Sequence, residues 1–151
     1  MRKLFAISLI LCVFISCKSA GKEKIVKSDK TDFQEVKHDD YELSKPNKGI
    51  EGVLVLFGGY PEKAEDIKRE FNVLDDAKKK NIAIVFMNYN QKLWLEESEK
   101  QKLAEQLQGI FEENDLPKTN IYFGGFSSGG NVAMFMSDFL SRPNSEMKPK
   151  G

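Results

Sequence analysis

Residues 121–130 read IYFGGFSSGG, and this stretch decides the fold of the chain. An apolar, strand-like run enters it, and a segment with the apolar spacing of an amphipathic helix follows it. It contains the pattern G-x-S-x-G between Gly125 and Gly129, with Ser127 at the centre. A serine on a sharp turn from strand to helix exposes its hydroxyl, and glycines on both sides permit the strained backbone and close packing. Ser127 is therefore the candidate nucleophile.

Three apolar runs alternate with three segments of helical periodicity. The runs are 53–57, 82–87 and 121–123, and the helical segments are 61–80, 96–113 and 132–139. Continuous apolar runs are typical of strands buried on both faces, and this alternation predicts parallel strands joined by right-handed crossovers. The sequence therefore predicts an α/β fold, a mostly parallel sheet with helices on both faces, with ligand sites at the carboxyl ends of its strands. Residues 33–43 alternate weakly and predict one or two edge strands.

The part from about Gly52 to Leu140 resembles the α/β-hydrolase superfamily, in particular its esterase- and lipase-like serine hydrolases. The resemblance rests on G-x-S-x-G in its strand–turn–helix context and on a second glycine pair, Gly58-Gly59, after the first apolar run. It implies an incomplete three-layer αβα fold that covers the N-terminal portion of a hydrolase domain. It also implies an ester or related acyl substrate.

The resemblance assigns further residues. Gly125 and Gly129 would be the glycines of the nucleophile elbow around Ser127. The backbone N–H of Ser128 would form one half of the oxyanion hole, and the N–H of Gly59 or Tyr60 would form the other. The chain departs from many esterases at Phe57, where they carry a histidine before the glycines.

The partners that a serine nucleophile needs are not found in the expected order. In this superfamily an acid and then a histidine follow the serine, because the histidine takes the hydroxyl proton and the acid orients it. His38 is the sole histidine and precedes the first clear strand. Asp138 would lie about 16 Å further along the same helix, at 1.5 Å per residue. We therefore expect the catalytic acid and histidine to lie beyond Gly151, so that the chain is the N-terminal part of a serine hydrolase.

Other interpretations of the same residues stay open. Residues 124–130 lack the glycine spacing of a dinucleotide loop and the Gly-Lys-Ser/Thr of a phosphate loop. An anion site at the following helix, or a glycine turn that only tightens packing, remains an alternative. A second hypothesis for the whole chain is a short, lipid-anchored binding or partner module without catalysis. Trp94 or Tyr60 would line a substrate pocket, or Trp94 would simply pack under the next helix.

The first residues have the organisation of an export signal. Arg2 and Lys3 precede an apolar run too short to span a bilayer, and Ser16 stands before Cys17. This resembles a bacterial lipoprotein signal, in which the cysteine becomes the lipidated first residue; an ordinary secretory signal cut after Ala20 is the alternative. The expected organisation is a signal peptide over 1–16, a flexible tether over 17–30 and the hydrolase part over 31–151. The protein would then be exported and anchored by lipid to the bacterial cell envelope.

Composition excludes several classes of function. The chain is 40% hydrophobic and 30% charged, with a formal net charge of zero, so it is globular and has no charge bias towards nucleic acid. Its two cysteines, Cys12 and Cys17, both lie in the leader, which leaves the body without a disulfide or a cysteine metal site. Because the body has one histidine and no cysteine, no metal site is expected. No cofactor is expected either.

Overall fold

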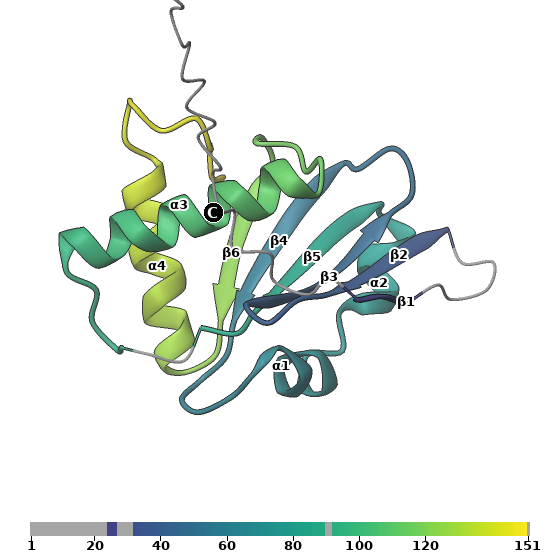
Figure 1. Cartoon of the computed structure of the whole chain (residues 1–151), viewed down its shortest axis with the longest axis horizontal. Helices are drawn as coiled ribbons and strands as arrows, with labels where there is room; N and C mark the ends of the chain where they lie inside the picture. The colour runs from purple at the N-terminus through teal and green to yellow at the C-terminus, as the bar shows by residue number, and fades with distance from the viewer. Residues whose placement is uncertain (1–23, 27–31, 90–91, 151) are drawn as a thin grey trace, which may run out of the picture.

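The computed structural model describes residues 24–26, 32–89 and 92–150, shown in Figure 1. Its elements in chain order are β1 (Lys24–Val26), β2 (Phe33–Lys37), β3 (Tyr41–Pro46), β4 (Gly52–Phe57), α1 (Ala64–Glu70), α2 (Leu74–Lys79), β5 (Ile82–Met87), α3 (Glu97–Glu113), β6 (Ile121–Gly125) and α4 (Ser128–Leu140). Strand β1 falls within the segment expected to be a tether. The rest of that segment, the signal peptide and the lipidation residue Cys17 lie outside the described residues.

The strands form one sheet in the order β1-β2-β3-β5-β4-β6. Strand β4 pairs in parallel with β5 and with β6, which confirms the three predicted parallel strands. Strands β1, β2, β3 and β5 pair antiparallel, so the sheet as a whole is mixed. The expectation of edge strands over 33–43 was wrong, because β2 lies between β1 and β3, and β3 lies between β2 and β5. The short turn after Lys37 makes β2 and β3 a hairpin, and a hairpin is necessarily antiparallel.

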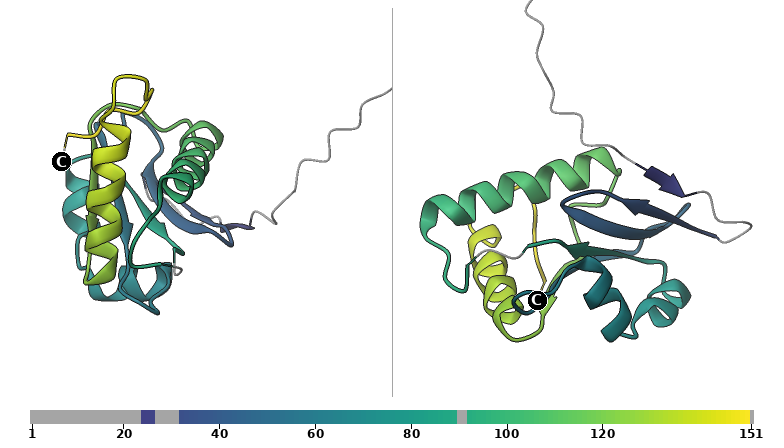
Figure 2. Two further views of the ribbon diagram at one scale, coloured as in Figure 1. Left: turned by 90° about the vertical axis from the view of Figure 1, so that its left-hand side faces the viewer. Right: turned by 60° about the horizontal axis from the view of Figure 1, so that its bottom comes forward.

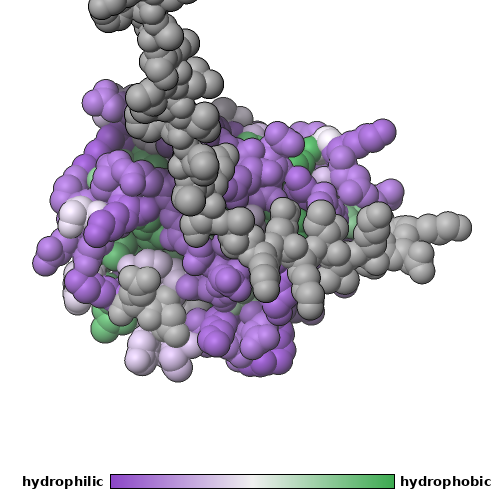
Figure 3. Space-filling view, viewed as in Figure 1, coloured by the Kyte–Doolittle hydropathy of each residue, from purple (hydrophilic) through white to green (hydrophobic). Residues whose placement is uncertain are grey.

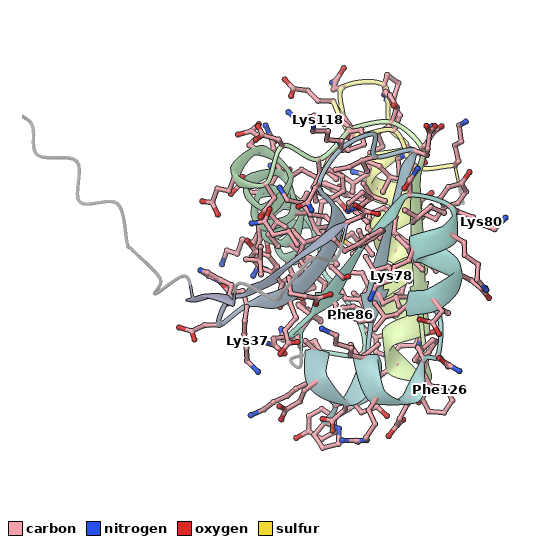
Figure 4. All side chains as sticks on the ribbon, turned by 90° about the vertical axis from the view of Figure 1, so that its right-hand side faces the viewer. Lys37, Lys78, Lys80, Phe86, Lys118 and Phe126 are labelled. Atoms are coloured by element: carbon pink, nitrogen blue, oxygen red, sulfur yellow. The ribbon has the colours of Figure 1, made fainter. Side chains whose placement is uncertain are left out.

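Helices cover both faces of the sheet, as the sequence predicts. Helices α3 and α4 pack on one face, and α1 and α2 pack on the other, with α3 opposite α1 and α2 in both views of Figure 2. The side chains of β4 alternate between these two layers: Val55 and Phe57 face α3 and α4, whereas Leu56 faces α1 and α2. Phe86 of β5 is fully buried against α1 and α2 (Figure 4). The fold is therefore a three-layer α/β arrangement.

The single helix expected over 61–80 is two short helices. Helix α1 ends where Phe71 takes an extended backbone conformation, and α2 begins at Leu74. The 20 expected residues would make a straight helix about 30 Å long. Strand β5, which the crossover must rejoin, has six residues and a length of about 20 Å. The break lets the chain turn back, and the partly buried side chains of Phe71 and Val73 pack on the sheet there.

Helix α3 matches its prediction. Glu96 and Glu99 form a reciprocal capping box at its start, and Asn114 ends it. Leu107 and Phe111 are fully buried on its inner side, while its outer side is charged and gives the face drawn in Figure 3 its mainly hydrophilic character. Across the described ranges, none of the helices combines the length and the apolar character needed to span a bilayer.

The segment after α4 returns to the edge of the sheet. Pro149 forms an isolated parallel bridge with Ile121, and the N–H of Lys150 donates to the carbonyl of Ile121 at 2.8 Å. Among the described residues after α4, this bridge is the one β pairing.

Candidate active site

Ser127 occupies a strained turn between β6 and α4. Its backbone has φ 52° and ψ −122°, a conformation that a residue with a side chain rarely adopts, and α4 begins at the next residue. The turn lies at the carboxyl end of β6, at the lower end of the sheet in Figure 1. Ser127 is exposed, as is its neighbour Phe126, which lies on the outside of the molecule in Figure 4. The turn over 125–129, hereafter the elbow, therefore exposes a strained serine between a strand and a helix, as the sequence predicts.

The two glycines of the motif are required by close backbone contacts. A Cβ added at Gly129 would lie 2.2 Å from the carbonyl oxygen of Phe57 and 2.4 Å from that of Gly58. A Cβ added at Gly125 would lie 2.4 Å from the carbonyl carbon and oxygen of Gly129. Helix α4 therefore starts in direct contact with the end of β4, and only glycine permits this approach.

The loop after β4 lies against the elbow. The N–H of Phe126 donates to the carbonyl of Phe57 at 3.2 Å, and a Cβ added at Gly59 would lie 3.4 Å from Cβ of Ser127. The carboxyl ends of the parallel strands β4 and β6 thus meet, as the sequence predicts. The loop that carries the candidate oxyanion amides is adjacent to the candidate nucleophile.

The three candidate amides differ in their hydrogen bonds. The N–H of Gly59 donates to Oε2 of Glu62 at 2.6 Å, and the N–H of Tyr60 donates to Oγ of Ser128 at 2.9 Å. The N–H of Ser128 has no hydrogen-bond acceptor within the part of the chain that the structure describes. The sequence pointed to Gly59, Tyr60 and Ser128, but it did not predict the hydrogen bonds that Glu62 and the Ser128 side chain accept from this loop.

A cavity of about 360 Å³ opens beside the elbow. Its walls are mainly apolar, and its lining residues are Gly58, Tyr60, Tyr89, Lys92, Leu93, Ser128, Gly129 and Val132. Tyr60 lines it, as one alternative expected. Trp94 does not: it packs on Phe135 of α4 with a ring-centroid distance of 5.7 Å, although 71% of the Trp94 residue surface is exposed. Tyr89 was not identified from the sequence; its place two residues after β5, at the carboxyl edge, was the available signal.

Two polar side chains of the cavity wall, Tyr89 and Lys92, carry no unpaired charge. Burial raises the pKa of the Tyr89 phenol above its ordinary value, so the ring is neutral at physiological pH. The ring of Tyr89 also stands edge-on to Phe57 at 6.0 Å. The ammonium of Lys92 is paired with Glu99, whose hydrogen bond raises the pKa of Lys92. The cavity therefore presents a neutral, largely apolar surface next to the elbow.

In the part of the chain that the structure describes, no hydrogen bond joins Oγ of Ser127 to a histidine or a carboxylate. His38 lies in the turn between β2 and β3, where its Nδ1 accepts the N–H of Asp40 at 3.2 Å and its ring stacks on Tyr41. Strand β3 is three strand spacings from β6, or about 14 Å across the sheet. Asp138 is an exposed residue of α4. Residues 24–26, 32–89 and 92–150 also contain no cluster of His, Cys, Asp or Glu side chains able to hold a metal ion.

Comparison with known proteins finds similarity in structure alone. No family model matches the chain, and no curated protein matches it. An arylesterase structure is 17% identical and covers 86% of this chain and 42% of its own, with a TM-score of 0.53. The acetyl xylan esterase from Paenibacillus sp. R4 is 13% identical over 82% of this chain and 51% of its own, with a TM-score of 0.54. The fluorophosphonate-binding serine hydrolase F from Staphylococcus aureus is 12% identical over 72% and 48%, with a TM-score of 0.50.

These likenesses define the class of fold. The described part of the chain has the α/β-hydrolase fold, shared with esterases and serine hydrolases at low sequence identity. The chain spans about half the length, or less, of the solved structures that it matches. The sequence-based expectation of an incomplete hydrolase fold is thereby confirmed at the level of architecture.

Proposed function

We propose that Ser127 is the nucleophile of a serine hydrolase that cleaves carboxylic esters. The observation that carries this proposal is the strained backbone of Ser127, held between two glycines whose contacts with β4 and α4 exclude any larger residue. Backbone strain of this kind costs about 1–3 kcal/mol and persists where the surrounding structure enforces it, most often at functional sites. A glycine turn that served packing alone would not require an exposed serine at this conformation.

In the proposed reaction, Oγ of Ser127 attacks the ester carbonyl carbon while a base takes the hydroxyl proton. The carbonyl oxygen becomes an oxyanion, which the N–H of Ser128 and the loop at Tyr60 stabilise by about 2.7–4 kcal/mol for each donor. The C–O bond to the alcohol then breaks, the alcohol leaves with the proton, and an acyl group remains on Ser127. We propose that the histidine and the acid of this triad come from residues outside the 151 of this chain.

The proposed substrate class is a neutral ester with a small apolar group. The cavity beside the elbow is at the lower end of the 300–1,000 Å³ typical of ligand pockets, and its charged residue is already paired. The structures that the chain resembles include an arylesterase and an acetyl xylan esterase, which supports an ester rather than another acyl substrate.

Fluorophosphonate labelling of the protein isolated from its native cells tests the proposal. We expect one labelled residue, Ser127, and loss of the label in a Ser127→Ala variant. A Ser98→Ala variant, which removes an exposed serine of α3, is the matched control and should label normally. A native protein that stays unlabelled would contradict the proposal and favour the non-catalytic, lipid-anchored binding module.

We also propose that the protein is exported and held at the cell envelope by a lipid on Cys17. This rests on the sequence pattern of the leader, which lies outside the described residues. A Cys17→Ser variant should move from the membrane fraction to the soluble fraction, whereas a Cys12→Ser variant should not. Unchanged fractionation of the Cys17 variant would contradict the proposal.

A further inference from the structure

The loop after β4 does not offer its two candidate amides equally. Gly59 and Glu62 close a tight turn, in which Gly59 donates its N–H to the Glu62 carboxylate and accepts the Glu62 N–H at 2.6 Å. The N–H of Gly59 therefore already donates to a carboxylate within its own turn and is not free to donate to an oxyanion. The neighbouring N–H of Tyr60 instead crosses to α4, where Oγ of Ser128 accepts it at 2.9 Å.

We propose that the side chain of Ser128, and not only its backbone, belongs to the oxyanion site. Its Oγ accepts the N–H of Tyr60, and its hydroxyl donates its own hydrogen to the oxyanion. The amide of Tyr60 then acts on the oxyanion indirectly, through the Ser128 hydroxyl, in a two-step hydrogen-bond relay. This inference rests on the proposed role of Ser127 as the nucleophile. The residue after the nucleophile would then supply two donors, its N–H and its hydroxyl.

The hydrogen-bonding capacity of a serine supports this relay. A hydroxyl has one hydrogen to donate and two lone pairs to accept with. In the described part of the chain, Oγ of Ser128 accepts the N–H of Tyr60 and donates to no protein group. Because Ser128 lines the cavity, its hydroxyl hydrogen can donate to a substrate bound there. Accepting one hydrogen bond polarises a hydroxyl and strengthens the bond that it donates.

The contact between Tyr60 and Ser128 also positions the loop. It joins residues 68 positions apart, and Tyr60 is 73% exposed, so burial of its side chain cannot hold the loop in place. The Glu62 turn fixes the loop from one side and Ser128 fixes it from the other. The donors are therefore oriented before a substrate arrives, which avoids the cost of ordering them during the reaction.

Amide hydrogen exchange in the 151-residue chain tests the contact without any catalysis. We expect the N–H of Tyr60 to be protected although the residue is exposed, and to exchange about tenfold faster in a Ser128→Ala variant, the effect of losing a hydrogen bond worth about 1.4 kcal/mol. A Ser128→Thr variant retains the hydroxyl and should keep the protection. Equal exchange of Tyr60 in the unmodified chain and the alanine variant would overturn the inference.

Acylation of Ser127 tests the donor. With p-nitrophenyl acetate as the acyl donor and imidazole as a diffusible base, acetylation of the exposed Ser127 is measured by peptide mapping, with Ser98 as the internal reference. We expect it to be at least about tenfold slower in the Ser128→Ala variant and close to normal in the Ser128→Thr variant. An alanine variant as fast as the unmodified chain would overturn the inference. A different result would overturn the proposed nucleophile, and the relay with it: the Tyr60 N–H is protected from exchange, but Ser127 is acetylated no faster than Ser98.

Discussion

Replacing Gly129 with alanine tests the packing that creates the elbow. The added Cβ would lie 2.2 Å from the carbonyl oxygen of Phe57, which is 1.2 Å closer than the 3.4 Å at which ordinary contacts begin. The obstacle is backbone, so no side-chain rotation relieves it, and α4 must move away from β4 by about 1 Å. Overpacking of cores costs about 1–3 kcal/mol, and we expect about 3 kcal/mol here because two carbonyl groups obstruct the methyl group.

The assay is equilibrium unfolding in urea, followed by far-ultraviolet circular dichroism. The matched control is the adjacent Gly130→Ala, whose Cβ would lie 3.4 Å from its nearest neighbour, the carbonyl oxygen of Gly125. A second control is Gly109→Ala in α3, where the added Cβ meets nothing within 4 Å and should raise the free energy of unfolding by about 0.5–1 kcal/mol. If the Gly129 and Gly130 variants had free energies of unfolding within about 0.5 kcal/mol of each other, the packing argument would be refuted.

Three further changes test other parts of the structure. Ser127→Gly should raise the free energy of unfolding by about 1 kcal/mol, because glycine tolerates the positive φ, and Ser127→Ala should bring no such gain in the same urea titration. Hydrogen bonds from Lys92 and from the N–H of Glu96 lower the pKa of Glu99 below its ordinary 4.5. The ion pair between Glu99 and Lys92 should therefore hold above pH 4.5 and be lost as the pH falls through the lowered pKa. The fluorescence of Trp94 should follow that titration, and a Glu99→Gln variant whose fluorescence titrates identically would count against it. Asn114→Leu should cost about 1–3 kcal/mol, since the buried amide nitrogen of Asn114 bonds the Tyr41 hydroxyl at 2.7 Å and the Ile110 carbonyl at 2.9 Å; an unchanged melting temperature would contradict this.

Local patterns in the sequence predicted the parts of the fold that depend on neighbours along the chain. The apolar runs of β4, β5 and β6 were readable because a strand buried on both faces needs apolar residues at every position. The elbow was readable because its strain and its close contacts restrict Gly125 and Gly129 to one residue type. The sequence of the β2–β3 hairpin showed only weak alternation of apolar and polar residues, and it did not predict that the hairpin lies inside the sheet.

The sequence by itself determined the α/β class, the carboxyl-edge location of the candidate site and Ser127 as its candidate nucleophile. Strand order, the break between α1 and α2 and the hydrogen-bond partners of the loop amides were decided only by the tertiary structure. The physical reason is separation along the chain. Tyr60 and Ser128 are 68 residues apart, and a hydrogen bond between them depends on how β4 and α4 pack, which no local propensity or spacing encodes. The hydrogen bond from the N–H of Gly59 to the Glu62 carboxylate likewise depends on the folded turn.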